Sequence, residues 1–186
     1  MSTSSNSRAL IEAALFAALA MVLSFIPDFA SWVTPSFGAI PLVFLSLRRG
    51  LKYGLVSGFI WGLLHFVLGK VYYLSLSQVV IEYLIAFTVM GLAELFANRF
   101  QKQLKAQQKS KALATAYLAS FIACAVRYFF HFVAGFLFWG SYAPKGMSAV
   151  WYSVTVNVPA GLATWGIVAI CLTVLILSYP RLFEVD

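Results

Sequence analysis

The sequence predicts an all-α integral membrane protein with six transmembrane helices and both termini in the cytoplasm. Three observations support this fold class: the composition, six apolar segments, and an uneven distribution of basic residues between the connections. Of the 186 residues, 62% are hydrophobic and 10% are charged, whereas about 25% of the residues of a soluble domain are charged. Because so little polar surface cannot cover a water-soluble globule, we expect a multi-pass protein of the cell membrane, surrounded by the lipid bilayer.

We assign the apolar segments to a single membrane domain, residues 1–186, with approximate spans 9–26, 37–47, 51–69, 75–97, 112–139 and 148–179. The first is expected to be retained, because it continues to Pro27 without the small-residue cleavage site of a signal peptide. A straight transmembrane helix needs about 20 residues. The second segment is shorter and contains Pro41, so we expect it to be tilted, broken or shielded by its neighbours. The last two exceed that length and can tilt or project from the membrane.

The basic residues of the connections give the orientation. If the N-terminus is cytoplasmic, only Lys70 and Lys145 lie outside. The inner side then carries Arg8, Arg48, Arg49, Lys52, Arg99, Lys102, Lys105, Lys109, Lys111 and Arg181. Cytoplasmic connections are enriched in Lys and Arg, so this distribution favours cytoplasmic termini. It also explains the net charge of +7 without nucleic acid, because the basic residues are dispersed among apolar segments.

Polar and aromatic side chains gather in the predicted outer half of the membrane. Arg127, His131, Gly135 and Trp139 recur every fourth residue, which places them along one side of a helix. The same half contains Trp32, Tyr72, Glu82, Tyr83, Tyr142, Tyr152 and Asn157. Intramembrane polar groups are costly and commonly face a cavity or a partner. The sequence therefore predicts a ligand pocket in the outer half of the membrane.

Glu82 is the strongest single candidate in this set. It lies within the apolar sequence SLSQVVIEYLIAFTVMGLA, where a carboxylate without a partner would have to neutralise. It can bind a cationic or hydrogen-bond-donating ligand, or it can pair internally with Arg127 or His131. We expect Arg127, the innermost member of the row, to be a charge partner below the site.

The other candidates also have structural alternatives. His131 can be a core histidine, Gly135 can serve close helix packing, and Tyr152 can belong to the aromatic belt of the interface. Asn157 is harder to explain structurally, because it brings both a donor and an acceptor to membrane depth. Trp139, Tyr83 and Trp32 can form aromatic faces for a flat or cationic ring.

The first segment contains a different pattern. Ala14 and Ala18 are four residues apart, and small residues at this spacing allow another helix to approach closely. They predict partner docking, with packing inside the chain as the alternative. The sequence lacks GxxxxGK[ST], HExxH, CxxC and GxSxG motifs, and its two cysteines, Cys124 and Cys171, are isolated. We therefore expect no catalytic residues, no metal, no cofactor and no ATP hydrolysis by this chain.

Over nearly its whole length, the sequence resembles the thiamin-specific substrate-binding subunit, or S-component, of energy-coupling factor (ECF) vitamin importers. The resemblance rests on LSLRRG at 45–50, GLVSGFIWG at 54–62, YLSLSQVVIEYL at 73–84, RYFFHFVAGFLFW at 127–139 and the spacing of Tyr152 and Asn157. It implies six membrane helices and an outward-facing thiamin pocket under the connection between the first two helices. It also implies delivery of thiamin through a transmembrane coupling subunit and two cytoplasmic ATPases.

The resemblance also implies roles for individual residues. Glu82, Tyr152 and Asn157 are the expected polar partners of thiamin, with Trp139 stacking on its aminopyrimidine ring. The thiazolium and its hydroxyethyl arm are expected near Trp32, Tyr83 and His131, with Tyr72, Trp61 and Gly135 as secondary contacts. The alanine pair Ala14 and Ala18 corresponds to the docking motif for the coupling subunit. Two departures from the family pattern are Pro144, where a tryptophan is expected, and Arg127, where lysine is frequent.

Three alternatives stay open at this level. The same architecture can bind a thiamin precursor or another vitamin. A small intramembrane enzyme could use Glu82 and His131, although no nucleophile accompanies them. A purely structural membrane partner would bind no small molecule.

Overall fold

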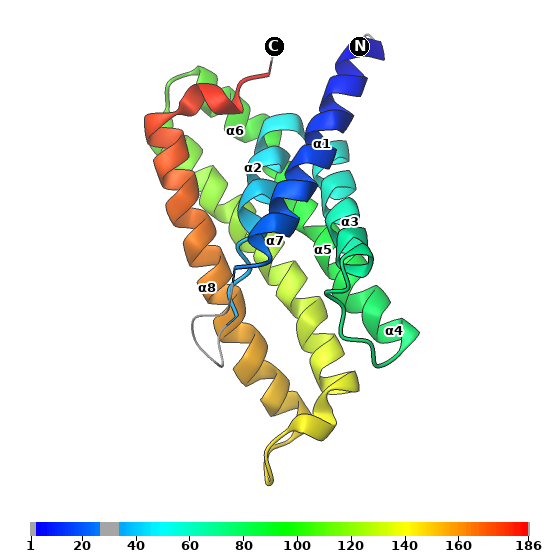
Figure 1. Cartoon of the computed structure of the whole chain (residues 1–186). Coiled ribbons are helices and arrows are strands. Elements are labelled where there is room, and N and C mark those ends of the chain that lie inside the picture. The colour runs from blue at the N-terminus through cyan, green and yellow to red at the C-terminus, as the bar shows by residue number, and fades with distance from the viewer. Residues whose placement is uncertain (1–2, 27–33, 186) are drawn as a thin grey trace.

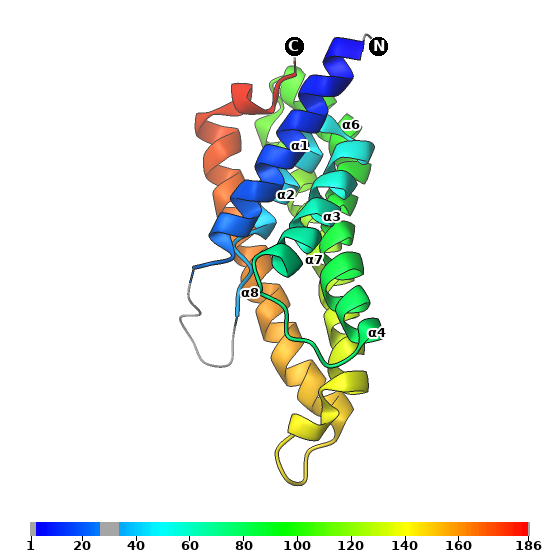
Figure 2. The ribbon, with the colours of Figure 1, turned by 45° about the vertical axis from the view of Figure 1, so that its right-hand side comes forward.

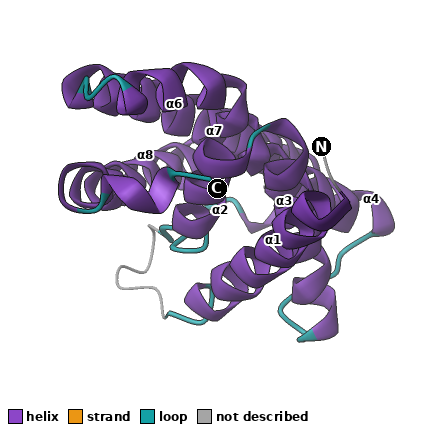
Figure 3. Cartoon of the chain, turned by 90° about the horizontal axis from the view of Figure 1, so that it is seen from above, coloured by secondary structure: helices purple, strands orange, loops and turns teal. Residues whose placement is uncertain are grey.

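The computed structural model describes residues 3–26 and 34–185, and within these ranges the chain is helical, with no strand (Figures 1 and 3). The elements are α1 (Thr3–Leu23), α2 (Ala39–Arg49), α3 (Leu51–Val67), α4 (Leu76–Val79), η1 (Val80–Ile85), α5 (Ala86–Thr88), η2 (Val89–Phe96), α6 (Ala97–Lys105), α7 (Lys109–Phe138), η3 (Gly140–Tyr142), α8 (Ala149–Ser178) and η4 (Pro180–Phe183). The all-helical prediction is confirmed.

Four of the described helices are long and apolar enough to cross a membrane. They are Asn6–Leu23, Leu76–Lys105, Lys109–Phe138 and Ala149–Ser178. The short second segment forms α2, which has 11 residues, and most of its side chains are buried. Its neighbours therefore shield it, which was one of the three outcomes expected for it. Pro41 lies in the first turn of α2, where a helix needs no backbone donor.

The membrane-crossing helix Leu76–Lys105, here called the composite helix, changes its hydrogen bonding along its length. It begins as α4, widens into the π-helical turn η1 and, after α5, tightens into the 3₁₀ segment η2 before α6. Ser75 caps its start, because the Ser75 Oγ accepts a hydrogen bond from the Gln78 backbone N–H over 3.2 Å. π-Helical turns are rare in proteins, and those that occur often lie at functional sites. The turn η1 contains Glu82 and Tyr83.

The helices surround α2, which lies near the centre when the bundle is viewed along its axis (Figure 3). The long helices α7 and α8 run antiparallel and are joined at the lower end of Figure 1, and α4 lies in the lower half of the same view. Both ends of the chain lie at the opposite end of the bundle (Figures 1 and 2). We call this the termini end and the other the far end.

Glycines on α3 bring the composite helix close to it. A Cβ on Gly58 would lie 3.0 Å from the Cα of Thr88, and a Cβ on Gly62 would lie 3.2 Å from the carbonyl carbon of Tyr83. Small residues at four-residue spacing allow such close helix contact. These contacts hold the backbone of η1 against α3 and leave the orientation of the Glu82 side chain to its own hydrogen bonds.

Candidate ligand-binding site

A polar cavity of about 250 Å³ lies beside the connection between α1 and α2. α3, the composite helix, α7 and α8 all contribute to its walls. The side chains that matter for its chemistry are Trp61, His65, Phe87, Arg127, His131 and Asn157. The cavity thus combines three predicted site residues, Trp61, His131 and Asn157, with three residues that the prediction did not assign to the site.

Arg127 lies in the wall of this cavity and is only 4% exposed. Its guanidinium carbon lies 4.7 Å from the ring centre of Trp61 and 4.5 Å from that of Phe87. Its Nε donates to the His131 Nε2 over 3.4 Å, while its Nη1 has no partner in the described part of the chain. Arg127 was expected below the site as a charge partner; instead it lines the cavity, and it forms no ion pair in the described part of the chain. Arg127 is a cavity residue held by aromatic rings.

Trp61 is fully buried and forms the base of the same wall. Its ring stacks on Phe87 with centroids 4.3 Å apart, and its Nε1 donates to the Ser24 Oγ over 3.0 Å. The latter bond ties α3 to the end of α1. The Lys70 Nζ also donates to the Ser24 carbonyl oxygen over 2.6 Å. Ser24, at the edge of the cavity, is thus held both by Trp61 on α3 and by Lys70 in the loop after α3.

Glu82 and Trp139 belong to a neighbouring hydrogen-bonded group. The Trp139 Nε1 donates to the Glu82 Oε1 over 2.7 Å, and the Gln78 Nε2 donates to the Glu82 Oε2. In the described part of the chain Glu82 forms no ion pair, so it is bonded to neither Arg127 nor His131. We call Gln78, Glu82 and Trp139 the carboxylate cluster.

Two predicted tyrosines connect this cluster to the loop before the composite helix. The Tyr72 backbone N–H donates to the Tyr83 hydroxyl over 3.0 Å. The Tyr72 ring lies edge-on to Trp139, with centroids 6.3 Å apart. Tyr72 itself is largely exposed, whereas Tyr83 is half-buried. The loop is thereby held over the side of the cluster.

Aromatic rings bridge the carboxylate cluster and the polar cavity. His65 lies between Tyr83 and Phe87, with ring centroids 5.8 and 4.6 Å away. Phe87 in turn lies 6.2 Å from His131. A flat ligand that contacts both groups would therefore meet a largely aromatic surface between them.

Gly135 and Asn157 meet where α7 contacts α8. A Cβ on Gly135 would lie 3.2 Å from the Asn157 Nδ2 and would overlap the Ser153 hydroxyl. The Asn157 Nδ2 donates to the Ser153 carbonyl oxygen over 3.0 Å and to the Ser153 hydroxyl over 3.2 Å. Gly135 thus serves close packing, and that packing holds Asn157. Tyr152 lies half-buried on α8, outside both the cavity lining and the carboxylate cluster.

The remaining predicted positions lie elsewhere. Trp32 is outside the described residues. Ala14 and Ala18 are exposed on α1, whereas Ala13 and Ala17 face the core. Packing inside the chain, the alternative role for these alanines, therefore applies to Ala13 and Ala17 and not to Ala14 and Ala18.

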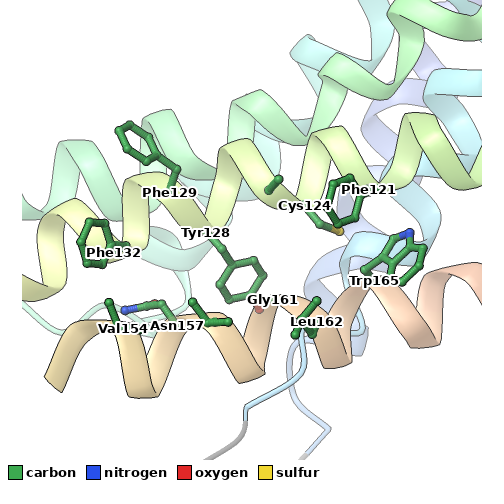
Figure 4. A pocket seen from close by; sticks show the side chains of 12 residues that line it. Phe121, Cys124, Tyr128, Phe129, Phe132, Val154, Asn157, Gly161, Leu162 and Trp165 are labelled. Carbon is green, nitrogen blue, oxygen red and sulfur yellow. The ribbon is translucent and has the colours of Figure 1, made fainter. Parts of the chain in front are cut away.

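A second groove, of about 370 Å³, lies between α7 and α8 (Figure 4). Its lining is almost entirely apolar, with Phe121, Phe129, Leu162 and Trp165 among its residues. Tyr128 and Asn157 line both this groove and the polar cavity. The groove lacks charged groups, so the polar cavity and the carboxylate cluster are the better candidate site.

Four members of the two groups were missed or misplaced by sequence reasoning: Gln78, His65, Phe87 and Arg127. Gln78 has a detectable signal, because it precedes Glu82 by four residues and so shares its side of the helix. His65 lies four residues after Trp61, and its Nδ1 is 2.9 Å from the Trp61 carbonyl oxygen. The same spacing rule that selected His131 and Trp139 would have selected both.

The fold and site together define a class: a multi-pass helical membrane protein that offers a polar pocket and, beside it, a half-buried carboxylate. The chain belongs to the family described as thiamine transporter protein (Thia_YuaJ), whose model matches residues 10–184. It is accordingly a non-enzymatic transport component of the cell membrane.

Two curated relatives and one solved structure extend this comparison. The chain is 38% identical to the thiamine transporter ThiT of Lacticaseibacillus paracasei, over 94% of this chain and 89% of the relative. It is 33% identical to ThiT of Bacillus subtilis, over 95% and 94% of the two chains. A solved structure of ThiT from Listeria monocytogenes matches with a TM-score of 0.93 and 40% identity, covering 97% of this chain and 99% of that one.

Proposed function

We propose that this protein is the high-affinity thiamin-binding subunit of an ECF-type, ATP-driven vitamin importer. In this proposal it captures extracellular thiamin and delivers it by association with a coupling module. Membership of the thiamine transporter family supports the ligand. The observation that carries the assignment to a site is Glu82, a half-buried carboxylate held by two neutral donors and by no cation in the described part of the chain.

The chemistry of thiamin suits the two neighbouring groups. Its aminopyrimidine can donate hydrogen bonds to Glu82 and exchange them with Asn157, with Trp139 as a stacking partner. Its cationic thiazolium ring suits the aromatic side chains of Tyr83 and His131. One cation–π contact contributes roughly 2 kcal/mol and one charge-assisted hydrogen bond about 1.5–3 kcal/mol, so high affinity requires several such contacts together.

In the membrane, we propose that all six apolar segments are embedded and that the termini end faces the cytoplasm. α2 and α3 then complete the six helices as shorter members, with α2 shielded inside the bundle. The exposed pair Ala14 and Ala18 on α1 is the proposed contact for a transmembrane coupling subunit. Two partner ATPases would supply the energy, because the sequence has no nucleotide-binding motif.

Titration of the purified protein with thiamin, followed by tryptophan fluorescence, tests the ligand. Saturable quenching below micromolar thiamin is expected, and it should be largely lost in Trp139→Phe. Trp165→Phe is the matched control, because Trp165 lines the apolar groove and its Nε1 donates to the Tyr117 carbonyl oxygen. A folded protein that shows no quenching at micromolar thiamin would refute the proposal.

Two further experiments test the identity of the ligand and the need for partner subunits. Competition by the free aminopyrimidine fragment, if it binds as tightly as thiamin, would indicate a precursor as the ligand. Proteoliposomes should accumulate thiamin only when the coupling subunit and both ATPases are present with ATP. Accumulation by this chain alone would contradict the ECF-type mechanism.

A further inference from the structure

Gln78 is fully buried and uses both ends of its amide group. Its Oε1 accepts a hydrogen bond from the Leu74 backbone N–H over 3.1 Å, and its Nε2 donates to the Glu82 Oε2. A backbone N–H can only donate, so the bond from Leu74 requires the amide oxygen on that side. The NH₂ group therefore has to face Glu82, and the orientation of the amide is fixed.

The result is a defined environment for the Glu82 carboxylate. One oxygen accepts from Gln78 on the same helix, and the other accepts from Trp139 on α7. Both donors are neutral, so they orient the carboxylate and satisfy its ionised form while leaving its negative charge uncompensated. A basic residue in the place of Gln78 would also orient Glu82, but it would neutralise the charge.

Glu82 needs this support because of where it lies. It is in the π-helical turn η1, and η1 contains no fully buried side chain. Gln78 lies one turn earlier, in α4, and is anchored through Leu74 to the loop that precedes the composite helix. Gln78 therefore links the carboxylate of Glu82 to the backbone of that loop.

We propose that Gln78 is a positioning residue for ligand recognition: it holds the Glu82 carboxylate in one orientation and in its ionised, acceptor-only form. This proposal rests on the proposed function, in which Glu82 receives the hydrogen-bond donors of the ligand. Gln78 acts through Glu82 and needs no contact with thiamin itself.

A double-mutant cycle tests this coupling. Gln78→Met keeps the length of the side chain and removes both the donor and the acceptor of the amide group, and we expect a roughly tenfold to hundredfold loss of thiamin affinity. In a Glu82→Gln background, the same change should have little further effect, because residues that act through one another are not additive. Gln78→Met with wild-type affinity, or full additivity with Glu82→Gln, would overturn the proposal.

A second variant gives a readout that a structural role would not move. In Gln78→Glu, the introduced carboxyl can replace the amide only while it is protonated, since it must then donate to Glu82 and accept from Leu74. We expect the ratio of its affinity to that of wild type to be near one at acidic pH and to fall as the pH rises. A ratio that does not change with pH would count against the proposal.

Two controls separate this outcome from other failures. Wild-type protein at each pH accounts for the titration of thiamin and of His65, His131 and Tyr83. Gln101→Glu is the matched substitution at the termini end, where the Gln101 Nε2 donates to the carbonyl oxygens of Leu47 and Phe183. The affinity of this variant for thiamin should equal that of wild type at each pH. If wild type itself binds no thiamin, the proposed function fails, whatever the variants do.

Discussion

Glu12 and Glu82 are both half-buried carboxylates on helices of the same bundle, but their partners differ in kind. At the termini end, Glu12 accepts from the Arg49 Nη2 and Nε over 2.5 and 2.6 Å and from the Arg48 Nε over 3.3 Å. In the far half, Glu82 is bonded to an indole and an amide. The first carboxylate is paired with two cations within the chain, whereas the second has no cationic partner in the described part of the chain.

The surroundings of the two carboxylates extend this difference. Arg48 also donates to the carbonyl oxygens of Leu182 and Glu184, which ties α2 to the residues after α8. Arg127, in contrast, is held by rings and leaves its Nη1 without a partner in the described part of the chain. Paired charges indicate a structural role at the termini end, whereas uncompensated groups are what a binding site requires.

The largest effect is expected at the termini end and should be confined to stability. Phe183 is fully buried, and its ring centre lies 4.6 Å from that of Phe44 and 5.0 Å from that of Phe100. Phe183→Ala should lower the free energy of unfolding by about 3–5 kcal/mol, measured by thermal denaturation in detergent. The variant that remains folded should bind thiamin as wild type does; a loss of affinity would show that the two regions are coupled.

Glu82→Gln should have the opposite outcome, with affinity lost and stability kept. Removing one charged acceptor is expected to cost about 1.5–3 kcal/mol, or roughly 10- to 100-fold in Kd, as measured by calorimetric titration. Glu12→Gln is the matched control, and it should lower Tm without changing the Kd for thiamin. If the two substitutions had the same effects, the contrast between the two carboxylates would not hold.

Gly135→Ala should lower both thermal stability and thiamin affinity, because Gly135 packs against α8 beside the site residue Asn157. The added Cβ would overlap the Ser153 hydroxyl and press on Asn157, and such overpacking costs about 1–3 kcal/mol. Both Tm and affinity should fall. Gly166→Ala on α8 is the control, since no atom outside the neighbouring backbone of its own helix lies within 4 Å of its added Cβ, and an equal loss there would exclude the packing explanation.

The smallest effect is expected for Trp139→Phe, which keeps an aromatic ring but removes the Nε1 donor to Glu82. The loss of one hydrogen bond should weaken thiamin binding by about 1 kcal/mol, or roughly fivefold. Calorimetry is the suitable measurement, because the fluorophore itself is removed. An affinity equal to that of wild type would mean that the indole N–H does not support the carboxylate.

Much of the fold followed from the sequence, because lipid exposure demands long apolar segments that are easily recognised. The burial of α2 was also among the expected outcomes, since its short length left it unsuited to face lipid alone. The packing of Phe183 was not predicted. Residues after 179 were assigned to a cytoplasmic terminus by charge, and such a pattern contains no information about which aromatic residue folds back.

The candidate site was predicted less completely. Glu82, His131 and Trp139 were selected because polar groups stand out among apolar neighbours. Their division between a cavity and a carboxylate cluster could not be predicted, because a π-helical turn has no distinct sequence pattern and changes the direction of each side chain within it. Arg127 was expected below the site, whereas it lies in the cavity wall with its guanidinium over the rings of Trp61 and Phe87.

The π-helical turn also has a consequence for how this helix can tolerate change in length. A wide turn accommodates about one residue more than a regular helix between the same two flanks. Deleting one residue within 80–85 could therefore restore a regular helix and leave the phase of α5 and α6 unaltered, so that the packing of the bundle survives. The same deletion outside η1 would rotate everything on one side by about 100°. The turn that carries Glu82 is thus the part of the helix where a deletion should disturb folding least and ligand recognition most.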